Sequence, residues 1–487
     1  MTAVHSYLDT LLPWLDDTAE GSPADTYLTF LAELLEQPES DGDAIILPPP
    51  AEETQPDLGI LQNPPVQLAM PYIWGDQFDN FLGEQTVFGD VVMNNGIDNT
   101  IYGFAGMDWI SGDGAGVGAA DVTDGGNDTI VGGTGITIAA GDALGVYGHA
   151  FVDGGGHDSI RGAADGDAIA GEALSRYGPY ATSYNGGFDT IIGGGGADTL
   201  SGDVLAMGEE AGGWALAVAG GNDTLMAGIG DDLVAGDVLA LQGASAVSYD
   251  GGDDFIDGGA GNDTLAGDGL VLGPGTATSE NGGDDTLLGG AGDDLMFGDT
   301  NGSEENGGDD ALFGGEGADS LHGGGGEDLI DGGAGVDQID GGAGSDRVIF
   351  DAEDHNAGAG GTVDGGAGVD TLLVDLLPAN DREDGSLDGV IDFSALADVW
   401  SGFERIDMTD SAGDDAIALD AADIVSLVGD GVLEIAGDLG DTVALNSGAG
   451  GNWGLQGSAG GFSTYVNDAG VQVSIDDDIT VLLNTAV

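Results

Sequence analysis

Hydrophobic positions in the middle of the chain recur every nine residues between runs of glycine. Four consecutive units, GGEGADSLH, GGGGEDLID, GGAGVDQID and GGAGSDRVI, occupy residues 314–349. Aspartate stands sixth in each unit, and an aliphatic residue stands eighth, at Leu321, Ile330, Ile339 and Val348. Three residues around one inward aliphatic side chain suit a short strand and are too few for a helix. The pattern predicts a parallel β-solenoid in which two units form one coil.

A longer period is superimposed on this one between residues 128 and 310. The signature GGNDTI recurs in variants whose acids are separated by 30, 31, 34, 31, 31 and 25 residues. Each period is interpreted as one 18-residue coil plus an insert of 7 to 16 residues, which follows a Gly-Asp or Gly-Glu pair. The acids of these pairs are Asp113, Asp142, Glu172, Asp203, Asp237, Asp268 and Asp299.

The inserts share one phase and should therefore leave the solenoid along one edge. Residues 238–241 and 246–249 look like the two strands of a small hairpin around Gln242 and Gly243. Two interpretations remain open. The inserts pack on one another and widen the core, because a lone apolar hairpin is unstable in water. Alternatively, apolar side chains such as Trp214 and Leu216 form a contact face between molecules.

The remaining sequence divides by composition. Residues 1–36 have helical spacing and predict either a cap over the solenoid end or a docking segment, and residues 37–72 read as a proline- and acid-rich linker. The solenoid spans 73–375. Residues 376–487 lose the repeat and alternate in strand fashion at 471–475 and 479–482, which predicts a β-rich cap. The expected fold is mainly β: a parallel β-roll with inserted hairpin loops, a short helical N-terminal segment and this C-terminal cap.

The charge balance points to bound cations. The chain has 89 acidic residues against 5 basic ones, a formal net charge of −84, with 97 glycines and no cysteine. Such a chain repels itself unless cations neutralise it, and it also repels nucleic acid. Glycine carbonyls converging in a tight turn, together with an aspartate, offer the oxygen ligands that calcium prefers. One turn supplies only part of a coordination shell, so an ion should be shared between stacked turns.

The nonapeptides resemble those of the RTX (hemolysin-type) family of secreted calcium-binding proteins over roughly residues 74–373. The resemblance implies a parallel β-roll with several calcium ions in its turns, whereas Asn99 and Thr137 depart from the acidic position. The ligands that it implies are Asp108, Asp128, Asp158, Asp167, Asp189, Asp198, Asp223, Asp232, Asp254, Asp263, Asp285, Asp294, Asp310, Asp319, Asp328, Asp337, Asp346 and Asp370, with Gly314, Gly317, Gly323, Gly326, Gly332, Gly335, Gly341 and Gly344.

The tail carries a second resemblance. The stretches FERIDMTDSAGDDAIALDAADIVSL, LEIAGDLGDTVAL and VSIDDDITVLL, with Trp453 and Tyr465, are similar to the C-terminal segment of many RTX exoproteins. This likeness implies an uncleaved type I secretion signal, the type I secretion machinery as a partner, and a bacterial protein that is secreted or held at the cell surface. The first residues lack the basic region of a Sec signal peptide, and no apolar run is long enough to span a membrane.

No catalytic motif is recognised. The five histidines form no HExxH, no G-x-S-x-G is present, and the absence of lysine excludes a P-loop or a Schiff base. The sequence therefore favours a secreted calcium-binding protein, not an enzyme, with a structural, self-assembling or adhesive role at the cell surface or in extracellular matrix. The alternative is a calcium-dependent binding module for a glycan, a protein or a mineral surface. A weaker alternative is a secreted hydrolase with an unrecognised site.

Overall fold

The computed structural model describes residues 72–74, 80–82, 85–87, 91–94 and 96–485, apart from 117, 179, 209–213, 243, 305–306, 350–360, 375–390, 394–398, 410–414 and 449. These residues all belong to the unit Ala69–Val487. The predicted helical segment 1–36 lies outside them, and so does the predicted linker 37–72 except for Tyr72, which begins the first strand.

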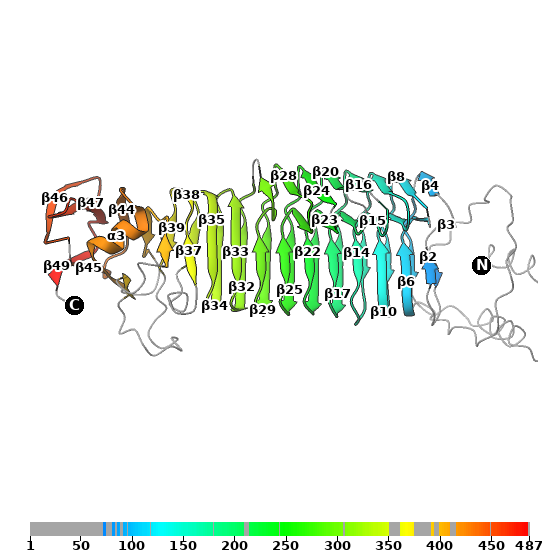
Figure 1. The fold of residues 1–487 in the computed structure, drawn as a ribbon, viewed down its shortest axis with the longest axis horizontal. Coiled ribbons are helices and arrows are strands. Elements are labelled where there is room, and N and C mark those ends of the chain that lie inside the picture. The colour runs from blue at the N-terminus through cyan, green and yellow to red at the C-terminus, as the bar shows by residue number, and fades with distance from the viewer. Residues whose placement is uncertain are drawn as a thin grey trace, which may run out of the picture. The chain divides into compact units, whose positions relative to one another are not determined.

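Strands of successive coils lie side by side in Figure 1 and pair in parallel with the equivalent strand one coil away. In the sheet that we call sheet A, Ile191 pairs with Leu225, and Leu225 pairs with Ile256. A strand of three to seven residues cannot satisfy its own backbone groups, so each coil depends on its neighbours for its hydrogen bonds. The predicted parallel β-solenoid is confirmed.

Sheets A and B follow the nonapeptide pattern. The solenoid strands of sheet A are β1 (Tyr72–Trp74), β5 (Thr100–Tyr102), β9 (Thr129–Val131), β13 (Ser159–Arg161), β17 (Thr190–Gly195), β21 (Thr224–Ile229), β25 (Phe255–Ala260), β29 (Thr286–Ala291), β32 (Ala311–Gly317), β34 (Leu329–Gly335), β36 (Arg347–Ile349), β39 (Thr371–Leu373) and β42 (Arg405–Asp407). Those of sheet B are β2 (Asn80–Leu82), β6 (Ala105–Ser111), β10 (Thr134–Ala140), β14 (Ala168–Ala170), β18 (Thr199–Ser201), β22 (Leu233–Ala235), β26 (Thr264–Ala266), β30 (Leu295–Phe297), β33 (Ser320–Gly325), β35 (Gln338–Gly344), β37 (Thr362–Asp364), β38 (Ala367–Gly368) and β41 (Trp400–Ser401).

The inserts build two further parallel sheets. Sheet C contains β3 (Gln85–Val87), β7 (Gly114–Gly116), β11 (Ala143–Gly145), β15 (Ala173–Ser175), β19 (Val204–Ala206), β23 (Val238–Leu241) and β27 (Gly269–Leu272). Sheet D contains β4 (Val91–Asn94), β8 (Ala120–Thr123), β12 (Ala150–Asp153), β16 (Tyr180–Tyr184), β20 (Trp214–Val218), β24 (Ser245–Tyr249), β28 (Ala277–Glu280) and β31 (Ser303–Glu304).

The hairpin interpretation of the inserts is wrong. Strand β23 pairs in parallel with β19 and β27, whereas β24 pairs in parallel with β20 and β28. The two strands of one insert thus belong to different sheets, and each finds its partner in the neighbouring coils. A parallel ladder along the whole stack saturates more backbone groups than isolated two-stranded hairpins could.

Each lobe of the coil has its own apolar interior. Between sheets A and B, one aliphatic side chain per strand points inward, as Ile191, Leu200 and Leu225 do with no exposed surface. Between sheets C and D the interior is rich in alanine, as at Ala215 and Ala240. The interpretation that the inserts pack on one another and widen the core is therefore confirmed.

The C-terminal region continues sheet A and adds sheet E. Sheet A gains β44 (Val432–Ala436), β46 (Trp453–Ala459), β47 (Phe462–Asn467) and β48 (Gln472–Asp476), the last three joined by antiparallel ladders. Sheet E contains β40 (Ile391–Asp392), β43 (Ala416–Leu419), β45 (Thr442–Asn446) and β49 (Thr480–Thr485). The predicted strand alternation of the cap is confirmed in β48 and β49.

One helix, α3 (Ala421–Val428), packs against this region among the described residues. Asp420 caps its first turn, and the side chain of Asp423 accepts a hydrogen bond from the Asp420 N–H, which completes a capping box. Within the described part of the chain, no helix has the length and apolar character needed to cross a membrane.

Candidate metal sites

Acidic side chains line the interior of the solenoid in three columns, each running from coil to coil. We name them after the sheet whose strands they precede or begin. The A column is Asp128, Asp158, Asp189, Asp223, Asp254, Asp285, Asp310, Asp328, Asp346 and Asp370; the B column is Asp108, Asp167, Asp198, Asp232, Asp263, Asp294, Asp319 and Asp337; the C column is Asp113, Asp142, Glu172, Asp203, Asp237, Asp268 and Asp299. All are buried, with at most 3% of their surface exposed.

Hydrogen bonds fix one oxygen of each A-column carboxylate and of the B-column carboxylates from Asp167 to Asp337. In the A column, the N–H of Asp158 donates to Oδ1 of Asp189 at 2.7 Å, and the N–H of Asp189 donates to Oδ1 of Asp223 at 2.7 Å. The B column repeats this arrangement, as where the N–H of Asp198 donates to Oδ1 of Asp232 at 2.7 Å. Each carboxylate is therefore held in register with its neighbours along the stack.

The second oxygen has no hydrogen-bond donor in most of these residues. Oδ2 is buried without such a partner in Asp158, Asp189, Asp198, Asp223, Asp232, Asp254, Asp263, Asp285, Asp294, Asp310, Asp319, Asp328, Asp346 and Asp370. Burying an ionised oxygen without a partner is strongly unfavourable. So regular a set of buried acceptors without donors is the arrangement expected of metal ligands.

Backbone carbonyls converge on the same points. A Cβ atom added to Gly193 would collide with Oδ2 of Asp198 and approach the carbonyl oxygen of Ala227 in the next coil. At Gly323 it would meet Oδ2 of Asp328 and the carbonyl oxygen of Gly341. The first glycine of each turn thus leaves room beside a carboxylate oxygen and a carbonyl oxygen that come from consecutive coils. An ion shared between stacked turns, as the sequence predicts, would need donors placed in this way.

The glycines proposed from the sequence fall into two groups. Gly314, Gly323, Gly332 and Gly341 lie beside the carboxylates in this way. Gly317, Gly326, Gly335 and Gly344 have φ angles from 140° to 159° and stack on the equivalent position of the preceding coil, where a Cβ would collide with a carbonyl oxygen. The second group therefore shapes the turn and lets the coils approach closely.

The two departures from the acidic pattern also lie in the columns. The N–H of Asn99 donates to Oδ1 of Asp128 at 2.6 Å, and its side-chain amide donates to the carbonyl oxygen of Gly112 at 3.0 Å. The N–H of Thr137 donates to Oδ1 of Asp167 at 2.5 Å. Both residues keep the backbone ladder, but neither brings a carboxylate.

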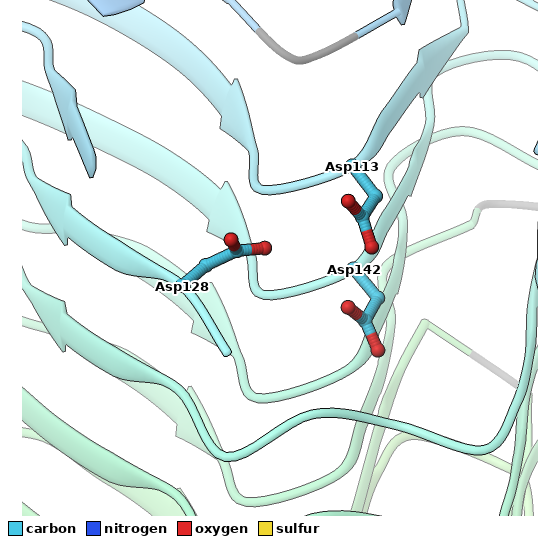
Figure 2. Close-up of side chains that lie close together, drawn as sticks. All are labelled: Asp113, Asp128 and Asp142. Carbon is cyan, nitrogen blue, oxygen red and sulfur yellow. The ribbon is translucent and has the colours of Figure 1, made fainter. Parts of the chain in front are cut away.

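The C column is the part of the site that sequence reasoning missed. Figure 2 shows Asp128 pointing between Asp113 and Asp142, and one oxygen from each carboxylate lies within 4.8 Å of the others. The signal was present in the sequence, because an acid follows glycine before every insert. It was interpreted only as the start of the insert, since nothing local indicates that the returning chain places an A-column aspartate against it.

The electrostatics of the columns favour a bound cation. Burial raises the pKa of Asp198 and Asp319 to about 7, of Asp328 to about 8 and of Asp310 to about 10. Burial, and then repulsion from Asp142, raises the pKa of Asp158 well above its ordinary value. A divalent cation among these oxygens would restore their charged form. The donors are carboxylate and carbonyl oxygens, which suit a hard cation with flexible geometry such as calcium.

Comparison with known families agrees with this donor set. The family model described as the RTX calcium-binding nonapeptide repeat matches residues 122–136, 185–204, 218–238, 250–269, 281–301, 306–339 and 313–348. The solenoid of this chain therefore contains RTX calcium-binding nonapeptide repeats. These repeats bind calcium, and the matched segments contain buried aspartates of the A and B columns together with acids of the C column. No curated protein gives a significant match to the chain.

Proposed function

We propose that this RTX protein is secreted and folds around calcium, and that it serves a structural, self-assembling or adhesive role at the cell surface or in extracellular matrix. The observation that carries the proposal is the pairing of two features in the same coils. Buried acid columns make folding depend on calcium, and an aromatic surface lies on the outer side of sheet D. A protein built in this way becomes rigid and presents its contact surface only where calcium is available.

The calcium ligands in this proposal are the A- and B-column aspartates and the carbonyl groups of the first turn glycines. Support comes from the buried Oδ2 atoms and from the carbonyls that meet them, as at Asp198 and Ala227. Each ion would lie between consecutive coils and would neutralise carboxylates from both. Calcium would thereby replace the repulsion along each column with attraction.

Secretion fits the same chemistry. Calcium is scarce in the cytosol, so the chain would remain unfolded and competent for export there, and it would fold after reaching calcium outside. We assign the export signal to the C-terminal segment because of its likeness to RTX exoproteins. Deletion of residues 430–487 should abolish export by a type I system while leaving the chain detectable inside the cell. Continued export of the deleted chain would contradict the assignment.

The proposed contact surface, which we call the aromatic face, lies on sheet D and the loops between sheets C and D. Tyr147 and Trp214 are 68% and 51% exposed. The rings of Tyr147 and Tyr177 stack with their centroids 5.4 Å apart, and the ring centroids of Tyr180 and Trp214 are 5.1 Å apart. Monomeric soluble proteins seldom expose a contiguous group of rings, whereas protein interfaces are enriched in them. The remaining members of the face are Phe151, Tyr184 and Tyr249.

The β20 strand offers a clean test of this face. Trp214, Leu216 and Val218 alternate with the fully buried Ala215 and Ala217, so the first three point away from the core. A variant in which these three residues are replaced by serine should retain its calcium-induced β spectrum. It should lose calcium-dependent self-association in light scattering.

The matched control for this test is Ile229→Ser, because Ile229 is 69% exposed but lies at a turn between sheets A and B. This variant should associate as the parent does. If the triple variant loses β structure and association at the same calcium concentration, the face is part of the core and not an interface. If the parent never associates, the structural role is contradicted.

A second candidate function uses the same face as a calcium-dependent binding surface for a glycan, a protein or a mineral. The exposed ring pairs favour this candidate because sugar rings stack on aromatic side chains. It predicts a calcium-loaded monomer that retains such a ligand, and the serine variant of β20 would lose the ligand without changing its oligomeric state.

A further inference from the structure

The C column is not explained by the nonapeptide pattern, and its place in the turn shows where it comes from. In the continuous turn Gly323–Asp328, the first glycine lies beside Oδ2 of Asp328 and the carbonyl oxygen of Gly341. In the coils with inserts, Gly236 lies in the same way beside Oδ2 of Asp254 and the carbonyl oxygen of Gly267. The insert therefore opens the turn directly after its first glycine. The acid of the C column occupies the position of the second glycine.

One oxygen of these acids helps to close the opened turn. Oδ2 of Asp142 accepts a hydrogen bond from the N–H of Gly156 at 3.3 Å, and Oδ1 of Asp299 accepts one from Gly308 at 3.0 Å. Glu172 accepts from Gly187 in the same manner. The acid thus ties the departing chain to the returning chain. This role requires a hydrogen-bond acceptor but no charge.

The other oxygen has no such role. Oε2 of Glu172 is buried without a hydrogen-bond donor, in a residue with no exposed surface. After burial, the carboxylates of Asp189 in the A column and Asp203 in the next coil contribute most to raising the pKa of Glu172, so both lie close to its carboxylate. Oδ1 of Asp142 is likewise buried without a donor, and the Asp142 carboxylate lies close to that of Asp113. Ionised carboxylates cannot donate to one another, so either a proton or a cation must lie between them.

We propose that the C-column acids are additional calcium ligands, so that each A-column ion in the coils with inserts is bound by one A-column carboxylate and by C-column carboxylates of consecutive coils. This inference rests on the proposed calcium array and deepens it. The carboxylates of Asp113, Asp128 and Asp142 already lie close enough together to share one ion. One A-column and one C-column carboxylate per coil together carry two negative charges, which neutralise one calcium ion. The B column offers only one carboxylate, and so one negative charge, per coil. More ligand charge gives tighter calcium binding.

The array should therefore contain two classes of site. The A-column sites of the coils with inserts form the tight class, and the B-column sites form the weak class, which is empty at low free calcium. Equilibrium dialysis of the full-length protein against a series of buffered calcium concentrations, with the bound calcium counted per chain, would resolve the two classes.

Glu172→Gln is the decisive variant, since glutamine keeps an oxygen that can accept from Gly187 but loses the charge. It should move one or two ions per chain from the tight to the weak class, a rise in Kd of roughly tenfold or more at those sites. Asp203→Asn, measured in parallel, should do the same and guards against a folding defect peculiar to one substitution. The matched control is Asp198→Asn in the B column, which should lose weakly bound calcium and leave the tight class unchanged.

The outcomes separate this inference from the function on which it rests. If Asp198→Asn loses weak ions but Glu172→Gln and Asp203→Asn leave the tight class intact, the C-column acids share protons and only close the turn. The inference is then overturned while the calcium array stands. If the parent binds no calcium, or if Asp198→Asn loses none, the array itself is contradicted.

Discussion

The coils with two strands and the coils with four strands carry the same A column of aspartates, but they use different lengths of chain. Over residues 311–349 a coil contains one strand of sheet A and one of sheet B, and both turns are continuous. Over residues 100–304 the coil also contributes strands to sheets C and D. The A-column ladder nevertheless crosses from one region to the other without a break, since the N–H of Asp285 donates to Asp310 at 2.8 Å and that of Asp310 donates to Asp328 at 2.9 Å.

A metal-binding turn therefore tolerates a long insertion when the insertion returns to its starting point. Sheets C and D stack with the period of the coil, so the returning chain re-enters at the GGxD sequence. The first glycine and the aspartate, now separated by the insert, still meet at the same place, as Gly236 and Asp254 do. The extra strands add a second apolar core and an outer face without disturbing the ion array.

The largest expected effect is that of calcium removal. In excess chelator, both regions should lose their β structure, because the second core of the four-strand coils lies directly beside unneutralised carboxylates. Circular dichroism should show the loss, and hydrogen exchange should show equal loss of protection in residues 199–272 and 311–349. Amides that stay protected in the four-strand coils would mean that the second core is stable without calcium, and that the two regions differ in their need for it.

The next effect concerns how the stability of the fold depends on pH, which should run in opposite directions without and with calcium. Burial raises the pKa of Asp328 to about 8 and of Asp198 to about 7, from about 3.9 in an unfolded chain. The calcium-free fold therefore binds protons that the unfolded chain releases. Its stability from these groups is present below about pH 4 and is lost as the pH rises through 7 to 8.

Circular dichroism in chelator should accordingly show a gain of β signal as the pH falls from 8 to 5. With calcium present the dependence should be opposite, because protons compete for the ligands and more calcium is needed for half-folding at pH 5. The same direction in both conditions would contradict the burial of these carboxylates in the folded protein.

A core substitution in each region comes next. Leu239 in sheet C and Leu321 in sheet B are both fully buried. Leu239→Ala and Leu321→Ala should each lower the free energy of local unfolding by about 2–5 kcal/mol, measured by hydrogen exchange in calcium. Leu241→Ala, at a partly exposed position of the same strand as Leu239, is the control and should cost less. If Leu239→Ala leaves the free energy of local unfolding unchanged, the inserts do not contribute to the core.

The smallest effect separates positions within the columns. Asp328 and Asp337 lie in the uninterrupted repeats 314–349, and Asp328 has a ladder carboxylate in both neighbouring coils, at Asp310 and Asp346. By contrast, the preceding position of the ladder beside Asp167 is Thr137, which has no carboxylate. Asp328→Ala and Asp337→Ala should therefore raise the calcium concentration for half-folding more than Asp167→Ala does. Circular dichroism titrations compare the three midpoints, and equal shifts would count against any gradation along the array.

Much of the array could be predicted from local sequence. Residue order places Asp319 five residues after Gly314 and Leu321 two residues after Asp319, and both side chains point inward as expected. The glycine turns and the strand alternation are set within one repeat, and the negative charge adds up over all repeats. The parallel coils, the inward aliphatic residues and the calcium chemistry therefore followed from the sequence alone.

The tertiary structure decided the pairing of the inserts and the role of the acids that precede them. Strands β23 and β24 are adjacent in sequence, which suggested a hairpin, but their hydrogen-bond partners lie about thirty residues away in the next coil. Glu172 faces Asp203 and Asp189 only because the insert closes on itself. Contacts between coils depend on where each insert rejoins the solenoid. That position is set by the stacking of all the coils, and no single repeat encodes it.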